Sequence, residues 1–103
     1  MIDVIHITIH KGALLKMDCL IDYSKKICYF LEDKKCEVSD TFLRKLETIL
    51  FSWDFEYGSL PGIDLEEFFI EVLSDNKTDV YHGKGKFPAN YNQLLEMIGE
   101  LYG

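Results

Sequence analysis

The strict alternation of residues 2–10 is the feature that most limits what this chain can fold into. In "IDVIHITIH", Ile5, Ile7 and Ile9 hold the odd positions, whereas two histidines and a threonine hold the even positions between and beyond them. A side-chain period of two is that of a β-strand with one buried face. The chain must therefore build a sheet with one apolar face and supply apolar elements that cover it.

Two further segments, 13–22 and 27–32, complete a predicted three-stranded meander. A three-residue loop at 10–12 places Gly12 where a positive φ is needed. This register pairs Ile9 with Ala13, Ile7 with Leu15 and Ile5 with Met17, and adds Cys19, Ile21, Cys28 and Phe30 to the same face. A two-residue turn at 11–12 would instead put Lys16 and Asp18 on the isoleucine face, so we favour the first register.

Helical periodicity appears twice in the rest of the chain. Ser39 or Asp40 is expected to cap the first helix, and Asn90 and Gln93 have the spacing of a capping box for the second. The first apolar stripe is Phe42, Leu46, Ile49, Leu50 and Trp53, and the second is Tyr91, Leu94, Leu95, Ile98 and Leu101. Between the helices, 54–63 is predicted to be a loop, and 66–73 and 79–82 are predicted to be strands.

The predicted order is β-β-β-(β)-α-β-β-α, where the bracketed strand is a short segment at 36–38. The order contains no strand–helix–strand crossover of the Rossmann type. We therefore predict an α+β fold in two layers: an antiparallel sheet of five to six strands with two helices on one face. The 103 residues are expected to form a single domain, 1–103.

The charge balance bears on partners. There are 11 basic and 18 acidic residues, a formal net charge of −7, and no basic run longer than a pair. Nucleic-acid backbones are bound by clustered Lys and Arg, so a DNA or RNA partner is not expected. An acidic surface serves either solubility or a basic protein partner, and the sequence leaves both open.

Composition also predicts the compartment. No apolar stretch approaches the ~20 residues that span a bilayer, and "MIDVIHITIH" does not have the pattern of a signal peptide. We expect a cytoplasmic protein without a membrane partner. Cys19, Cys28 and Cys36 match no CxxC spacing and are expected to be reduced, small apolar residues.

The segment "YHGKGKFPAN" at 81–90 raises the question of a phosphate-binding loop. A P-loop requires Ser or Thr after Gly-Lys, but Phe87 follows Lys86. A dinucleotide fingerprint requires glycine at position 88, which is Pro88. We therefore interpret the segment as a strand-to-helix connection whose two glycines permit a bend. Anion binding by its lysines at the helix start stays open.

No catalytic or metal site is predicted. On a strand, His6 and His10 lie about 13 Å apart, too far to share one metal, although His82 could approach one of them. Glu67 and Glu71 belong to the outward face of the strand at 66–73, and no nucleophile motif is present. We expect no cofactor, no metal and no enzymatic activity.

The sheet face opposite the core is more apolar than solvent exposure requires. Val4, Leu14, Leu20, Ile27, Tyr29, Leu31, Phe69 and Leu73 are assigned to it, among charged residues. An apolar patch with a charged rim is typical of a protein interface. The predicted interaction surface is Leu20, Tyr29, Leu31, Phe69, Glu67 and Glu71.

The second half of the chain resembles a pattern found in small uncharacterised bacterial proteins. Its parts are a helix ending at Trp53, a loop with Gly58 and Gly62, two strands, and "YHGKGKFPANY" before a C-terminal helix. Some proteins that look like this belong to toxin–immunity systems. The resemblance implies a fold and suggests a role, and it implies no catalytic residue.

Two hypotheses follow. In the first, the chain is a non-enzymatic protein-binding module that binds a basic toxin as an immunity-type inhibitor, or binds itself as a homodimer. In the second, it is a small-molecule-binding or enzymatic domain, with a pocket between residues 81–90 and 54–63 lined by Tyr57, His82 and Lys84.

Overall fold

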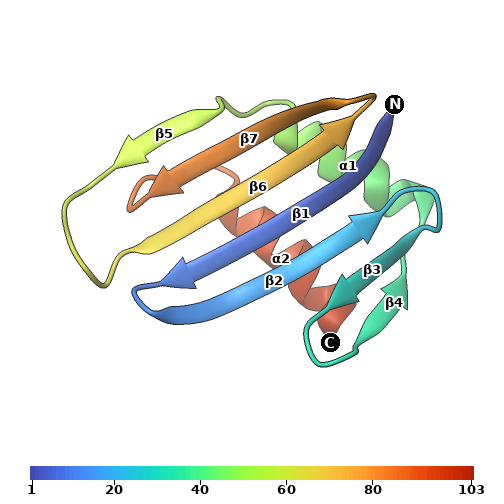
Figure 1. Ribbon diagram of the computed structural model, residues 1–103, viewed down its shortest axis with the longest axis horizontal. Coiled ribbons are helices and arrows are strands. Elements are labelled where there is room, and N and C mark those ends of the chain that lie inside the picture. The colour runs from blue at the N-terminus through green and yellow to red at the C-terminus, as the bar shows by residue number, and fades with distance from the viewer.

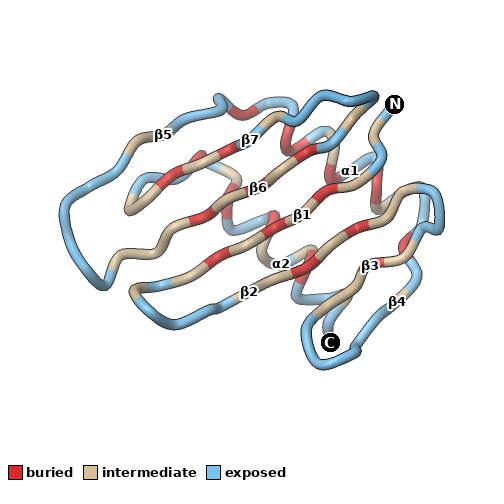
Figure 2. The backbone as a smooth tube through the Cα atoms, viewed as in Figure 1, coloured by how far each residue is buried: buried red, intermediate tan, exposed pale blue.

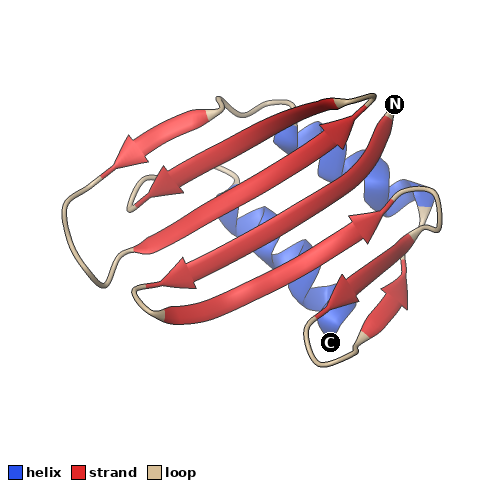
Figure 3. Cartoon of the chain, viewed as in Figure 1, coloured by secondary structure: helices blue, strands red, loops and turns tan.

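The computed structural model describes residues 1–103 and consists of one seven-stranded sheet and two helices (Figure 1). The strands are β1 (Ile2–Lys11), β2 (Leu14–Asp22), β3 (Ile27–Phe30), β4 (Lys35–Glu37), β5 (Glu56–Ser59), β6 (Glu66–Ser74) and β7 (Lys77–Lys84). The helices are α1 (Asp40–Leu50) and α2 (Tyr91–Tyr102). Figures 1 and 3 show both helices behind the same face of the sheet. Neither helix is long and apolar enough to cross a membrane.

The strands lie in the order β4-β3-β2-β1-β6-β7-β5. The predicted α+β class is confirmed, but the prediction of five to six antiparallel strands is wrong. There are seven strands, and β5 pairs with β7 in parallel. β5 lies inside the predicted loop 54–63 and consists of only four residues, "EYGS". Four residues are too few to show an alternation of apolar and polar side chains. The position of β5 is set by its backbone pairing with β7.

The predicted faces of β1 and of β2 from Met17 onward are confirmed, whereas the predicted register and the predicted faces of Leu14 and Leu15 are wrong, since Leu15 lies opposite His10 and not opposite Ile7. Ile5 pairs with Ile21, Ile7 with Cys19 and Ile9 with Met17, four residues further along β2 than expected. The turn has two residues, 12 and 13, and Lys16 is the extra residue of a bulge between Leu15 and Met17. A bulge shifts the side-chain alternation by one residue. It therefore restores the apolar pairing that a two-residue turn alone would have broken.

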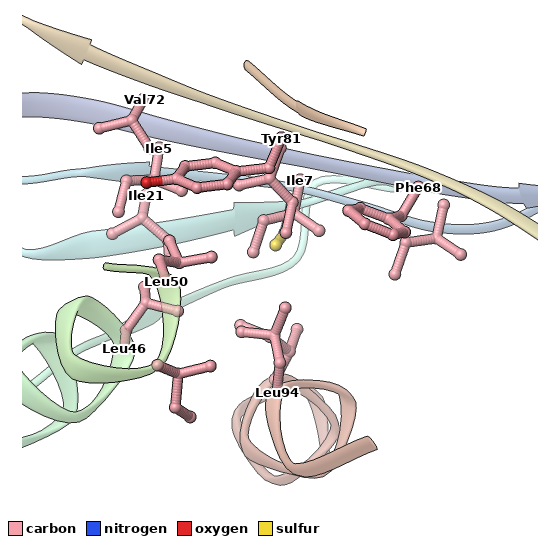
Figure 4. Packing of buried hydrophobic residues seen from close by; sticks show 14 of the residues in the cluster. Ile5, Ile7, Ile21, Leu46, Leu50, Phe68, Val72, Tyr81 and Leu94 are labelled. Carbon is pink, nitrogen blue, oxygen red and sulfur yellow. The ribbon is translucent and has the colours of Figure 1, made fainter. Parts of the chain in front are cut away.

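The core lies between the sheet and the helices. Figure 4 shows Ile5, Ile7, Ile21, Phe68, Val72 and Tyr81 pointing from the strands toward Leu46 and Leu50 of α1 and Leu94 of α2. They belong to a cluster of 19 buried hydrophobic residues, and the core holds no buried polar or charged residue. The alternation of buried and half-buried residues along β1, β2 and β6 is visible in Figure 2. Stability therefore comes chiefly from apolar burial on one side of the sheet.

The two helices begin differently. The Ser39 hydroxyl accepts a hydrogen bond from the backbone N–H of Phe42 at 3.0 Å, which confirms the expected cap of α1. The capping box predicted for α2 is wrong, since the Asn90 side chain makes no cap hydrogen bond. Its amide oxygen instead accepts a hydrogen bond from the Trp53 indole N–H. Trp53 lies three residues beyond the end of α1 and is buried, as predicted.

Candidate interaction site

The sheet face that points away from the helices is formed by alternate residues of the strands. We call it the open face. By register, its apolar members are Val4, Leu20, Ile27, Tyr29, Phe69, Leu73 and Val80. No helix covers this face (Figure 3). It is half-buried only because neighbouring side chains pack against one another across the strands.

One row of cross-strand neighbours runs across the middle of the open face. It consists of Asp18, Thr8, Phe69, His82 and Glu56, on β2, β1, β6, β7 and β5. The centroid of the Phe69 ring lies 4.7 Å from that of His82 and 6.1 Å from that of His10. The Phe69 ring thus lies between two imidazoles at the centre of the open face.

His82 is bound by carboxylates at both ring nitrogens. Its Nδ1 lies 2.7 and 2.9 Å from the two oxygens of Glu56, and its Nε2 lies 2.6 Å from Oε2 of Glu67. A neutral imidazole has one N–H and one lone pair, so only the imidazolium can donate to both carboxylates. Partial burial favours the neutral ring, but the hydrogen bonds that the ring donates to Glu67 and Glu56 outweigh it and raise the pKa of His82. The same contact lowers the pKa of Glu56.

The other two histidines have separate carboxylate partners. His6 Nε2 lies 2.9 Å from Oδ1 of Asp18, and His6 Nδ1 lies 3.6 Å from Oε1 of Glu71. His10 Nε2 lies 3.4 Å from Oε1 of Glu67, which also binds His82. His10 and His82 are thus linked through the shared carboxylate of Glu67. No group of three His, Cys, Asp or Glu residues is arranged to hold a metal ion.

Carboxylates dominate the charge of the open face. On β1, β2, β5, β6 and β7 the acidic residues at its positions are Asp18, Asp22, Glu56, Glu67 and Glu71, and the lysine is Lys84. Lys16 does not add to the charge of the open face, because it forms an ion pair with Glu66, the first residue of β6. Glu66 also accepts a hydrogen bond from the hydroxyl of Tyr91, the first residue of α2. The open face is therefore acidic even with the His82 cation included.

Five of the six residues predicted as an interaction surface lie together on the open face. Leu20 and Tyr29 are cross-strand neighbours, and Glu67, Phe69 and Glu71 follow along β6. Leu31 lies apart, past the end of β3, where it lines a cavity with residues of α2. Sequence reasoning missed Glu56, and no sequence signal could have placed it beside His82, because the parallel β5–β7 pairing was not predictable.

The three cysteines form no disulfide, and two of them are enclosed in the core. These two are Cys19 and Cys28, which are completely buried. A hydrogen bond with Cys28, together with burial, raises the pKa of the Cys19 thiol. A buried neutral thiol is a poor nucleophile.

The local backbone explains the two glycines within residues 81–90, Gly83 and Gly85. A Cβ on Gly83 would lie 2.3 Å from the Lys86 carbonyl oxygen and 2.7 Å from the Phe68 ring. Gly85 has a φ of +70°, and its N–H donates to the carbonyl of Glu66 at 2.9 Å. The chain folds tightly back over Phe68 here, as a bent connection between β7 and α2 requires.

Comparison of the chain with protein-family models, curated proteins and solved structures gives no match. Functional inference therefore depends on the geometry of the open face and its surroundings.

Proposed function

We propose that this protein is a non-enzymatic, cytoplasmic protein-binding module whose open face binds a basic protein. In its most specific form, the module is an immunity-type inhibitor that covers the functional surface of a basic toxin. The main support is that the open face, which no helix covers, combines Tyr29, Leu20 and Phe69 with more carboxylates than cationic groups. The two-layer arrangement leaves this face accessible across most of the sheet.

Both parts of that surface suit protein binding. Aromatic and aliphatic side chains at the centre of an interface supply most of the affinity. Carboxylates around them attract a basic partner and speed association. Glu71 is 44% exposed and Asp18 is 29% exposed, so each can contact a partner without leaving the sheet.

The alternative, a ligand pocket beside residues 81–90, has less support. β5 (56–59) pairs directly with β7, with Glu56 opposite His82 and Ser59 opposite Lys84, so no space for a pocket separates these two segments. None of the three main cavities is lined by Tyr57, His82 or Lys84.

The experiment is affinity capture from the native host with matched baits, followed by mass spectrometry. Tyr29→Glu and Glu71→Lys alter the open face, whereas Glu100→Lys makes the same charge change on the exposed side of α2. We expect a basic protein to be retained by the wild type and Glu100→Lys, released by salt, and lost with both open-face variants. Equal retention by all baits, with circular dichroism showing each folded, would contradict the proposal.

A further inference from the structure

The outer edge of β2 is only partly covered. On this outer side, β3 pairs only with Cys19–Asp22, so Leu14–Asp18 has no strand beside it there. Figure 1 shows this half of β2 without a neighbour on its outer side. An unpaired edge offers backbone N–H and C=O groups to another strand. The remaining edges of the sheet are short, since β4 has three residues and β5 has four.

An apolar cavity opens beside this free edge. Its volume is about 340 Å³, and Leu15, Met17, Phe30, Leu31, Ile98 and Tyr102 line its apolar part. Leu14, Leu15 and Leu31 are 66%, 45% and 51% exposed. The same surface thus contains both exposed leucines and a cavity that can receive one, which makes it complementary to itself.

Charge favours a second copy of this chain as the occupant. The charged residues of the cavity are Lys16, Asp18 and Glu32, and Lys34 lies next to it over the Tyr102 ring. With Glu66, the partner of Lys16, two positive and three negative groups lie here, so this area is less acidic than the open face. Two acidic molecules can therefore approach each other here with less repulsion than their open faces would produce.

We propose that two copies associate by a two-fold contact between the free edges of β2, with a leucine of each copy entering the cavity of the other. A two-fold axis beside Lys16 places Leu15 of each copy next to Met17 of the other. The two lysines at the axis do not repel strongly, because each is paired with its own Glu66. The bulge at Lys16 shortens the ladder, so the leucine contacts carry the dimer, and its association is weak and reversible.

The test is sedimentation equilibrium over concentrations from about 10 μM to about 1 mM, the range of weak complexes. We expect a monomer–dimer equilibrium for the wild type and a dissociation constant at least ~10-fold higher for Leu15→Glu. Val80→Glu is the matched control, because Val80 is 42% exposed on the open face. It should dimerise like the wild type. Added salt should strengthen this dimer, whereas it should weaken binding of a basic partner, so the two proposals fail independently.

Amide hydrogen exchange supplies a second readout. Exchange at Leu14–Asp18 should slow as concentration rises, and exchange on β7 should not change. If Leu15→Glu fails to fold by circular dichroism, Leu31→Glu takes its place, since Leu31 lies outside the strands. A wild type that stays monomeric throughout, or a dimer that persists in both leucine variants, would overturn the proposal.

Discussion

His82 shows how a single proton can hold two elements together. Its imidazolium links Glu56 of the edge strand β5 to Glu67 of β6, so loss of the proton leaves one carboxylate facing a lone pair. Apart from this link, β5 is attached to the sheet only through a short parallel ladder. We therefore expect the link to contribute more to stability than a surface ion pair usually does.

The contribution of His82 to the stability of the protein should be lost as pH rises above 6.5. The pKa of His82 is raised above its usual 6.5, so its contribution is fully present below that value and is lost as pH rises through the folded-state pKa. Thermal unfolding at a series of pH values should show this loss in the wild type and a flatter curve in His82→Gln. Parallel curves for the two proteins would show that the link does not contribute.

Trp53 should be among the most sensitive positions to truncation. Trp53 is 7% exposed, and its indole N–H donates a hydrogen bond to Asn90. The centroid of its ring lies 5.8 Å from that of Phe68 and 6.2 Å from that of Tyr81. Trp53→Ala removes these contacts and leaves a cavity, so we expect a loss of about 3–5 kcal/mol in the free energy of unfolding. Urea denaturation measures it. Trp53→Phe should lose less, and a Trp53→Ala variant as stable as the wild type would contradict the packing.

At the scale of elements, the N-terminus of α1 depends on one hydroxyl. Ser39→Ala removes the acceptor for the Phe42 N–H and should cost about 1 kcal/mol of stability. Thr41→Ala, on the exposed side of the first turn, is the control and should change stability much less. Equal losses in the two variants by urea denaturation would indicate that the cap is not important.

The elements also show how far the sequence could be read. The alternation in β1 and β6 and the periodicity of α1 and α2 predicted most of the buried residues, since one buried face imposes one period. In α1, however, Leu43 is buried and was not predicted, and Phe42 is only partly buried. The β1–β2 register was not predictable, because a three-residue turn and a two-residue turn with a bulge bury the same isoleucines. Alternation alone cannot distinguish them. β5 was missed since its pairing to β7 depends on backbone groups that every residue has.

For the molecule as a whole, bound metal should not contribute to stability. His10 and His82 share the carboxylate of Glu67, and His6 is paired with Asp18 instead. No three of the His, Cys, Asp and Glu residues are arranged to hold a metal ion. We expect elemental analysis to find no stoichiometric zinc, and the melting temperature to be unchanged by a chelator. One equivalent of zinc, or a melting temperature lowered by the chelator, would mean that the histidines rearrange around an ion.

The open face was predictable in composition but not in arrangement. The sequence placed Leu20, Tyr29, Glu67, Phe69 and Glu71 outward, because period two assigns each residue to a face. It could not show that Glu67 is shared by two histidines, since the contact with His10 joins β1 to β6, which are distant in the chain. Predicting it requires that β1 lies beside β6, which the local pattern does not contain.

The central position of β1 has a consequence for folding during synthesis. β1 pairs with β2, which follows at once, and with β6, which leaves the ribosome more than 50 residues later. Until then, one side of a strand rich in isoleucine stays unpaired, and the helix α2 that covers part of it does not yet exist. Pairings between distant segments form slowly and expose aggregation-prone surface. The nascent chain should therefore depend on chaperones most strongly in the interval before β6 emerges.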